Sequence, residues 1–233
     1  MKIWFYLYLI FLGYSCANSG QEIEDSAPTN MKQVKHIAYN ALSKYPHDTT
    51  LFTEGYFIHD GKHYESTGSP EELPNLNSLF GIRDLKSGII LSPVYLDKKL
   101  YFGEGIAIIK NAIYQLTYRN QKGFIYDATT FAKLGTFKYT SREGWGLTTD
   151  SINLIMSDGT NKISYINPVT FKIEKEIYVT KNDSILGNLN ELEFVEGFIF
   201  ANVFTTDFIV KINPETGRWL VLLILVIYTS RQH

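Results

Sequence analysis

Cysteine and long apolar runs are the scarcest features of this sequence. Cys16 is the single cysteine among 233 residues, which excludes a disulfide framework and a cysteine-ligated metal site. The two continuous apolar runs, at 3–13 and 219–228, are shorter than the roughly 20 residues that a membrane-spanning helix needs. The formal net charge is only −2, and lysine and arginine are scattered. We therefore expect neither a nucleic-acid-binding face nor an acidic substrate.

The signatures of several enzyme classes are missing as well. The chain has no Gly-x-Ser-x-Gly elbow and no phosphate-binding loop, which mark many hydrolases and nucleotide-binding enzymes. Its five histidines show no dense metal-ligand spacing. His59 and His63 are four positions apart but span a turn, so we interpret them as a solvated pair. The sequence therefore predicts no metal site and no cofactor.

Aromatic residues are abundant, and their pattern favours an all-β fold. The chain has 16 tyrosines and 15 phenylalanines, mostly in short segments between turns, and no segment keeps the 3.6-residue apolar spacing of a helix. Its length suits one repeat-built domain as well as two globular ones. The expected strands are 52–58, 63–67, 77–85, 89–96, 106–109, 113–118, 123–127, 132–139, 145–148, 153–157, 162–166, 172–179, 191–195, 198–203, 208–212 and one from 219 onward.

One turn recurs four times along the chain. Asp84, Asp127, Asn167 and Asn213 open it, at intervals of 43, 40 and 46 residues. Asp and Asn start turns by hydrogen bonding to the backbone that follows, and proline, next in the last two turns, presets the φ angle. A period in the low forties with four short strands per unit is typical of β-propeller blades. The alternative is a coincidence among unrelated hairpins.

A polar or aromatic residue, mostly beside glycine, opens the first strand of each repeat. In a propeller these strand starts face one mouth of the central channel, so we expect Glu54, Glu104, Trp145 and Asn190 to converge there. Glu104 is the leading candidate because glycines on both sides let a ligand approach closely. Shielding by aromatic residues would raise its pKa, which suits proton transfer near neutral pH. The alternative is that these glycines only shape turns and the acids are incidental.

The two ends of the chain predict processing rather than fold. Residues 1–16 have the pattern of an export signal, and Ser15-Cys16 resembles a bacterial lipoprotein cleavage site, although Gly13 stands where leucine is usual. Residues 17–32 form a polar tether, and 34–45 could be an extended lead-in strand. We expect an exported periplasmic or cell-surface lipoprotein of a bacterium, anchored to the membrane through a lipid on Cys16. The alternative is an ordinary cleaved signal with an incidental cysteine.

Nine short motifs follow one another in an order that resembles a known family. They are Phe-Thr-Glu-Gly from 52, Ser-Thr-Gly from 66, Phe-Gly-Glu-Gly from 102, Tyr-Gln-Leu-Thr from 114, Gly-Phe-Ile-Tyr-Asp from 123, Glu-Gly-Trp-Gly-Leu-Thr from 143, Ser-Asp-Gly from 157, Leu-Asn-Glu-Leu-Glu from 189 and Ala-Asn-Val-Phe-Thr-Thr-Asp from 201. Over residues 34–218 the chain resembles the plant- and bacterial-type glutaminyl cyclases (glutamine cyclotransferases).

The resemblance implies a fold, a reaction and a set of site residues. It implies a five-bladed β-propeller that converts the N-terminal glutamine of a peptide or protein to pyroglutamate and releases ammonia, without zinc. Glu104 matches the catalytic glutamate, which we expect to act as general acid and base. Pocket positions are matched by Phe52, Phe102, Trp145 and Asn190.

The chain departs from the family at three of these positions and at its end. Glu54 stands where plant members carry glutamine, and Tyr118 and Phe204 stand where tryptophan is common. The family's fifth repeat carries a pocket lysine and has no counterpart here, so we expect about four blades and a truncated or aberrant C-terminus. The expected propeller domain is 33–218 and the apolar tail 219–233. We expect a monomer, and either an enzyme impaired by the truncation or a fragmentary gene model of a competent one.

Two other functions remain open at this level. A non-catalytic propeller could bind a peptide or protein at the same mouth, which the changes at Tyr118 and Phe204 favour. A metal-dependent hydrolase of the lactonase-like propellers could use oxygen ligands from Asn190, Glu54 and Glu104.

Overall fold

Strands make up all the regular structure of the residues that the structure describes. The computed structural model describes residues 35–182 and 184–225. The expected signal, Cys16, the tether and the end of the apolar tail lie outside these residues. No helix of the described residues is long and apolar enough to cross a bilayer.

Four sheets, each with four antiparallel strands, form most of the domain, and we call them blades 1 to 4; a fifth, parallel strand extends the sheet of blade 4. Blade 1 is β2 (Phe52–His59), β3 (Lys62–Gly68), β4 (Leu79–Arg83) and β5 (Ile90–Tyr95). Blade 2 is β6 (Gly103–Ile109), β7 (Ala112–Thr117), β8 (Lys122–Asp127) and β9 (Lys133–Lys138). Blade 3 is β10 (Leu147–Thr149), β11 (Leu154–Ser157), β12 (Lys162–Ile166) and β13 (Ile173–Tyr178). Blade 4 is β16 (Leu189–Val195), β17 (Phe198–Val203), β18 (Phe208–Ile212) and β19 (Trp219–Ile224).

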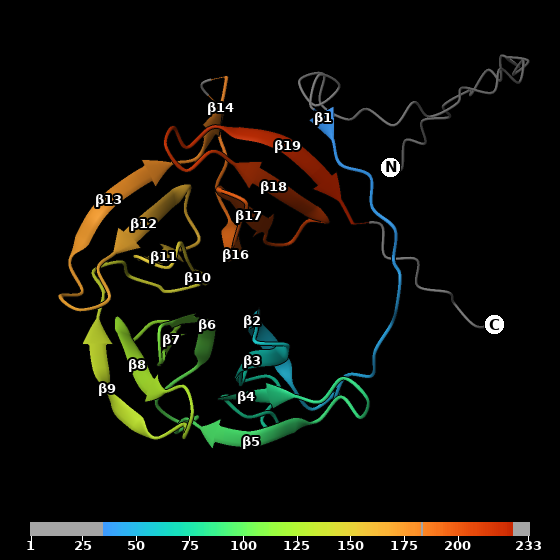
Figure 1. Ribbon diagram of the computed structural model, residues 1–233, viewed down its shortest axis with the longest axis vertical. Helices are drawn as coiled ribbons and strands as arrows, with labels where there is room; N and C mark the ends of the chain where they lie inside the picture. Colours follow the sequence, from blue (N-terminus) through green and yellow to red (C-terminus); the bar gives the residue numbers. More distant parts are fainter. Residues whose placement is uncertain (1–34, 183, 226–233) are drawn as a thin grey trace, which may run out of the picture. The chain divides into compact units, whose positions relative to one another are not determined.

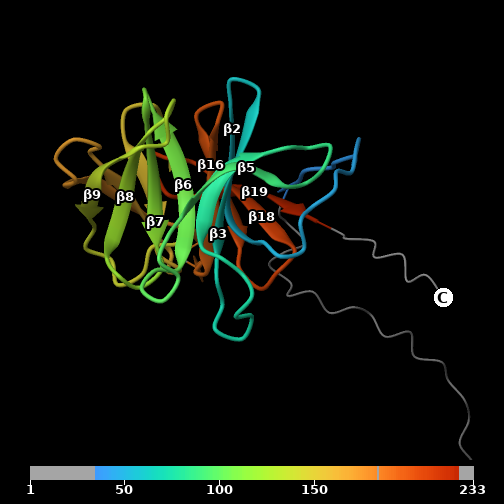
Figure 2. The same cartoon turned by 90° about the horizontal axis from the view of Figure 1, so that it is seen from below.

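The blades surround a central opening with their first strands innermost. β2, β6, β10 and β16 contact one another in that order, and β16 also contacts β2 (Figure 1). In the view turned by 90°, β6, β7, β8 and β9 stand side by side from the centre outward (Figure 2). The predicted all-β propeller with four blades is therefore confirmed.

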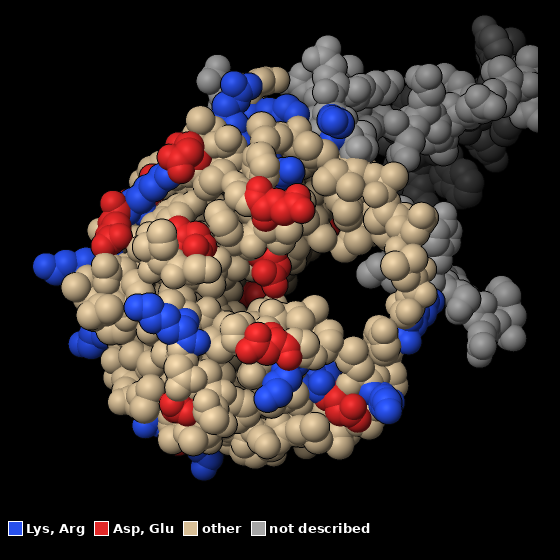
Figure 3. Space-filling model, in the orientation of Figure 1, with Lys and Arg blue, Asp and Glu red and all other residues tan. Residues whose placement is uncertain are grey.

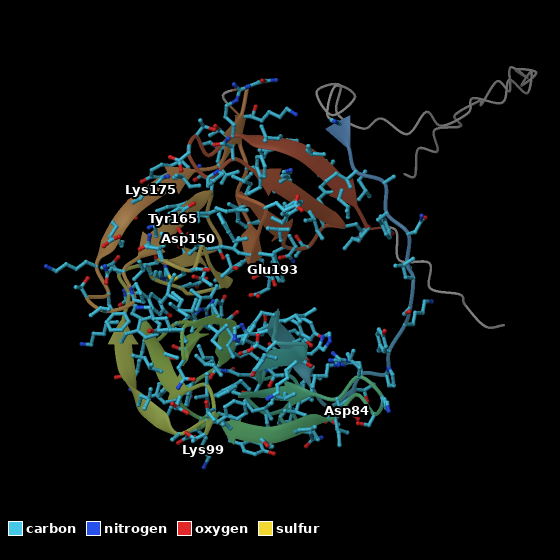
Figure 4. The ribbon with its side chains drawn as sticks, viewed as in Figure 1. Asp84, Lys99, Asp150, Tyr165, Lys175 and Glu193 are labelled. Carbon is cyan, nitrogen blue, oxygen red and sulfur yellow. The ribbon has the colours of Figure 1, made fainter. Side chains whose placement is uncertain are left out.

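The recurrent turn joins the third and fourth strand of every blade. The side chains of Asp84, Asp127, Asn167 and Asn213 accept hydrogen bonds from backbone N–H groups two and three residues ahead. In each turn the N–H four residues on donates to the carbonyl of the first residue. The turn predicted from the sequence thus sets the outer corner of each blade, as Figure 4 shows for Asp84.

Three apolar cores hold successive blades together. Blades 1 and 2 enclose Phe80 and Ile113, blades 2 and 3 enclose Leu116 and Leu154, and blades 3 and 4 enclose a third cluster that includes Ile155 and Ile199. Apolar burial of this kind is the main stabilising term in a domain of this size. The side between blade 4 and blade 1 has no such core among the clusters of the described residues.

A strap, residues 37–48, spans the side between blade 4 and blade 1 (Figure 1). At its start, β1 (Lys35–His36) pairs in parallel with β19. At its end, Pro46 O accepts a 2.7 Å hydrogen bond from Arg83 Nη2, and His47 Nε2 lies 3.0 Å from Glu65 Oε1. The lead-in strand expected over 34–45 is therefore limited to β1, because beyond residue 36 the chain leaves the edge of blade 4.

Two elements remain to be described, β19 and a small extra sheet. The strand expected from 219 onward is present as β19 (Trp219–Ile224), which pairs with β18 along its length, although these residues were also assigned to the apolar tail. Its side chain Leu222 enters the core of blades 3 and 4, so the fourth sheet extends beyond the predicted boundary at Arg218. A two-stranded sheet of β14 (Thr180–Lys181) and β15 (Ser184–Ile185) lies between blades 3 and 4 in the sequence. Its two-residue strands are too short to show a pattern.

Candidate functional site

Three of the four convergent residues lie on β-bulges of the innermost strands. The strand register shifts at Glu54 in β2, at Glu104 in β6 and at Asn190 in β16. A bulge turns a side chain away from regular alternation and is common beside active sites. Trp145 stands just before β10 and accepts a 2.9 Å hydrogen bond at its carbonyl oxygen from Gly105 N. The local structure therefore gathers all four predicted residues around the inner strands.

Glycines beside these residues admit the next blade rather than a ligand. A Cβ atom on Gly55 would lie 2.9 Å from Ile106 N, and one on Gly105 would lie 2.4 Å from Leu147 N. A Cβ atom on Gly146 would lie 2.2 Å from Asn190 O. The expectation that these glycines make room for a ligand is thus corrected, because backbone of the neighbouring blade already fills that space.

Glu104 lies at the centre of this arrangement. The residue is only 5% exposed. Its backbone carbonyl accepts a 2.5 Å hydrogen bond from Ser66 Oγ of blade 1, and Gln115 Nε2 donates to Ser66 Oγ at 2.9 Å. Because these partners come from blades 1 and 2, the position of Glu104 is fixed by the junction of two blades.

Five aromatic side chains form a continuous arc beside Glu104. Successive ring centroids in the order Phe52, Phe102, Tyr118, Trp145 and Phe204 are 6.4, 5.8, 6.5 and 5.4 Å apart. Phe52 and Phe204, at the two ends, are 42% and 49% exposed. The family resemblance pointed to all five as pocket positions, and the structure brings them together as one aromatic arc that starts on blade 1 and ends on blade 4.

Polar contacts and close packing fix the middle of the aromatic arc. Glu143 accepts 3.0 Å hydrogen bonds from Trp145 Nε1 and from Arg119 Nε. The Arg119 guanidinium lies 4.4 Å from the centre of the Tyr118 ring, in cation–π geometry. Gly159, in the Asp-Gly turn after β11, leaves space for the Trp145 ring, since a Cβ atom there would lie 2.6 Å from Cζ2. The indole is therefore held rigidly beside the site.

The opening holds four carboxyl groups with raised pKa values. Burial raises the pKa of Glu54 to about 8 and that of Glu193 to about 7. Burial raises the pKa of Glu104 well above its ordinary value, and the nearby charge of Glu54 raises it further. Burial also raises the pKa of Glu191 well above its ordinary value, and the charges of Glu54 and Glu193 add to this effect. Like charges in a shielded site favour the protonated form, so these groups can hold protons near neutral pH. In the space-filling view, acidic side chains line the rim of the opening (Figure 3).

Sequence reasoning missed Glu191, Glu193 and Glu143 as site residues. The motif Leu-Asn-Glu-Leu-Glu was noted, but only Asn190 was selected from it. In the other three repeats glycine follows the selected residue, whereas here Glu191 follows Asn190. That departure was the available signal.

The described carboxylates do not assemble a metal-binding set. Within residues 35–182 and 184–225, no group of three or more His, Cys, Asp or Glu side chains is placed to hold a metal ion. His59 and His63 have separate partners, Asp60 at 3.4 Å and the Tyr56 hydroxyl at 2.6 Å. The alternative set of Asn190, Glu54 and Glu104 includes only two side chains of these types, so it stays a prediction.

Comparison with known proteins gives consistent matches. Residues 9–231 match the family model described as glutamine cyclotransferase. A glutaminyl-peptide cyclotransferase of Arabidopsis thaliana is 30% identical over 217 residues, which cover 91% of this chain but only 65% of that protein. The crystal structure of Myxococcus xanthus glutaminyl cyclase matches with a TM-score of 0.70 and 28% identity, over 77% of this chain and 73% of that chain.

Proposed function

Because the chain belongs to the glutamine cyclotransferase family, we propose that it converts the N-terminal glutamine of peptides or proteins to pyroglutamate and releases ammonia. The observation that supports this most is the buried Glu104 carboxyl beside an arc of five aromatic rings. A shielded carboxyl with a raised pKa suits proton transfer near neutral pH, and the aromatic arc offers an apolar wall for a small side chain.

The proposed reaction is an attack of the substrate on itself. The α-amino nitrogen attacks the carbon of the side-chain amide and forms the C–N bond of a five-membered ring. The bond between that carbon and the amide nitrogen then breaks. Both reacting groups belong to one residue, so the protein needs only to hold the folded conformation and move protons.

Glu104 moves the protons in this scheme. Its carboxylate takes a proton from the α-amino nitrogen as the ring closes and then gives that proton to the leaving nitrogen, which departs as ammonia. Asn190 orients the substrate by hydrogen bonds from its side-chain amide. The aromatic arc excludes water, so that the amide is cyclised rather than hydrolysed.

The first experiment measures ammonia release from a peptide with N-terminal glutamine. E104Q keeps the shape of the side chain but removes the proton acceptor, and we expect its kcat to fall by roughly 10²- to 10⁴-fold. The matched control is E215Q, the same substitution at an exposed residue of the turn between β18 and β19, which should keep wild-type activity. Full activity in E104Q would refute the role of this residue.

A non-catalytic peptide-binding protein is the second candidate. It draws support from the exposed rings of Phe52 and Phe204 at the ends of the aromatic arc, since exposed aromatic side chains are frequent in binding surfaces. Saturable binding of glutamine-initiated peptides without any ammonia release would favour this function over catalysis.

We also propose an exported, monomeric protein that works without zinc and is anchored by a lipid on Cys16. The support is the sequence pattern of residues 1–32 and the family resemblance. C16A should move the protein from the membrane fraction to the soluble fraction of a bacterial host. Dialysis against a chelator should leave ammonia release unchanged, and light scattering should give the mass of one chain.

A further inference from the structure

Blade 4 differs from the other blades at one position of its innermost strand. Gly55, Gly105 and Gly146 occupy this position in blades 1 to 3, where the next blade approaches too closely for a Cβ atom. Blade 4 carries Glu191 there. A carboxylate therefore stands at the position where blades 1 to 3 have a glycine packed against the backbone of the next blade.

The fold directs Glu191 toward the central opening. Leu189 and Leu192 are both buried in the core shared with blade 3, and the bulge between them places Asn190 and Glu191 opposite a single residue of β17. Side chains two apart on a strand share a face, and Figure 4 shows Glu193 directed into the opening from β16. Glu191 therefore lies on the same side, next to the predicted pocket residue Asn190.

Two buried oxygen atoms at this place have no hydrogen-bond donor. Glu191 Oε1 and Asn202 Oδ1 are buried and have no partner within the described residues. The corresponding residues of blades 1 and 3, Ser66 and Ser157, donate to carbonyl oxygens of the next blade at 2.5 and 2.7 Å. A buried polar atom without a partner destabilises the folded protein, so this place is suited to a ligand that supplies N–H donors.

Acidic side chains around these atoms favour a ligand that is positively charged as well as an N–H donor. Glu54 and Glu193 face the same opening, and with burial they raise the pKa of Glu191 well above its ordinary value. A carboxyl in that state binds a proton strongly when the site is empty, and a cation beside it would stabilise the ionised form. An ammonium group, with its several N–H donors and positive charge, meets both requirements.

We propose that Glu191, together with Asn202, forms the subsite that holds the free α-amino group of the substrate. The inference rests on the proposed function and adds a substrate-contacting residue to it. Glu191 adjoins Asn190 in the sequence, and its charge acts on Glu104. An amino group held by Glu191 thus lies within the same site as the proton-transferring carboxyl. The bound ammonium first gives one proton to the Glu191 carboxylate, and the resulting amine attacks the amide while Glu104 carries the second proton to the leaving nitrogen. A substrate whose α-nitrogen is blocked loses this contact.

The test compares two peptides of one sequence, one with a free N-terminus and one acetylated, as competitors of a glutamine-initiated substrate. The residue at their N-terminus is norleucine, which cannot cyclise. We expect wild-type protein to bind the free peptide at least about 10-fold more tightly, the size of one charge-assisted hydrogen bond of roughly 1.5 kcal/mol. In E191Q the affinity for the free peptide should exceed that for the acetylated peptide by less than about 3-fold. The KM for the substrate should rise about 10-fold, with a smaller change in kcat.

Matched variants separate a direct contact from general charge and from misfolding. E193Q removes one charge from the same face but leaves Glu191 in place, so the preference for the free amine should persist. Equal losses in E193Q and E191Q, or an unchanged ratio in E191Q, would overturn the proposal. The comparison of the two peptides on wild-type protein does not depend on the folding of any variant. If wild-type protein bound both peptides equally, that result would be enough to overturn the proposal.

Two further measurements separate a failure of the α-amine subsite from a failure of the proposed function and from binding of the product. Ammonia release by wild-type protein checks the proposed function directly, so turnover combined with an unchanged ratio in E191Q defeats only the α-amine subsite. Ammonium chloride is the other arm, because the released ammonia shares the chemistry of the α-amino group. Competition by ammonium chloride without any preference between the two peptides would assign the subsite to the product and overturn the proposal.

Discussion

At the scale of single residues, the site is defined by carboxyl groups whose pKa values are raised by burial. Glu54 is the informative one because its charge is the first of the neighbouring charges that raise the pKa of Glu104. E54Q removes that charge, so the pKa of Glu104 should fall. We predict that the acid limb of the kcat/KM profile for cyclisation moves to lower pH in E54Q, measured against wild type between pH 5 and 10. A limb that stays in place or moves to higher pH would contradict this coupling.

The same carboxyl predicts a pH dependence of stability. The pKa of Glu54 is about 8 in the folded protein against 4.5 for the free group, so the folded state binds this proton more tightly than the unfolded state. Its contribution to stability is fully present below about pH 4.5 and is lost as the pH rises toward 8. We predict that E54Q melts a few degrees above wild type at pH 9, where about 1 kcal/mol corresponds to roughly 2–4 °C. Calorimetry at pH 4.5 should show no such gain.

Sequence reasoning placed four candidate residues together because they repeat at equivalent positions, and the family resemblance added the other aromatic ones. Glu54, Glu104, Trp145 and Asn190 stand at the start of successive inner strands, and the turn spacing made that equivalence visible. Glu191 escaped because its one mark in the sequence is its place after Asn190, where the other three repeats have glycine. Its burial and its unpartnered oxygen depend on packing between distant strands.

At the scale of elements, the inner strands approach so closely that glycine is required between blades. G146A places a Cβ atom 2.2 Å from Asn190 O and 2.7 Å from Glu191 Cα, both backbone atoms that cannot rotate away. We predict a loss of about 1–3 kcal/mol in the free energy of unfolding, measured by urea denaturation, with reduced cyclisation because Asn190 is displaced.

Gly135 in β9 provides the matched control for this prediction. A Cβ atom there meets nothing within 4 Å, so G135A should change stability by no more than about 0.5 kcal/mol. Equal losses in the two variants would show that contact between blades is not the reason for glycine at position 146.

The strands themselves were predictable where two signals coincided. Each recurrent turn has an Asp or Asn side chain that bonds to the following backbone, and apolar alternation flanks it on both sides. β1, β14 and β15 have two residues each, and pairing with a distant partner rather than local pattern decides that they form. The lead-in segment was therefore expected to be a longer strand than the two residues that pair.

At the scale of the whole domain, the strap couples blade 4 to blade 1 through buried charges. Glu65 is fully buried and contacts His47 at 3.0 Å and Arg83 at 3.2 Å. E65Q leaves Arg83 without its carboxylate, and loss of one partner of a buried ion pair costs about 3–5 kcal/mol. We predict a lower melting temperature and faster tryptic cleavage after Lys44, which is exposed in the strap.

The exposed ion pair between Lys175 and Glu215, 3.1 Å apart, is the control for the strap. Surface pairs of this kind contribute at most about 1 kcal/mol, so E215Q should melt and be cleaved like wild type. Cleavage after Lys44 at the wild-type rate in E65Q would contradict the anchoring role of Glu65.

The number of blades could be read from the sequence, but the closure of the domain could not. Four registered turns fix four blades. The strap instead depends on Glu65, Arg83 and His47, which lie far apart in the sequence and carry no motif. Their contact follows only once β3, β4 and the strap are folded against one another.

The central claim is that Glu104, buried where blades 1 and 2 meet, drives cyclisation of N-terminal glutamine. Its most direct test is the mass of a glutamine-initiated peptide after incubation with the protein. We predict that wild-type protein removes the mass of one ammonia from the peptide, whereas E104Q leaves the peptide unchanged over the same time. Equal conversion by both proteins, or no conversion by folded wild-type protein, would contradict the account.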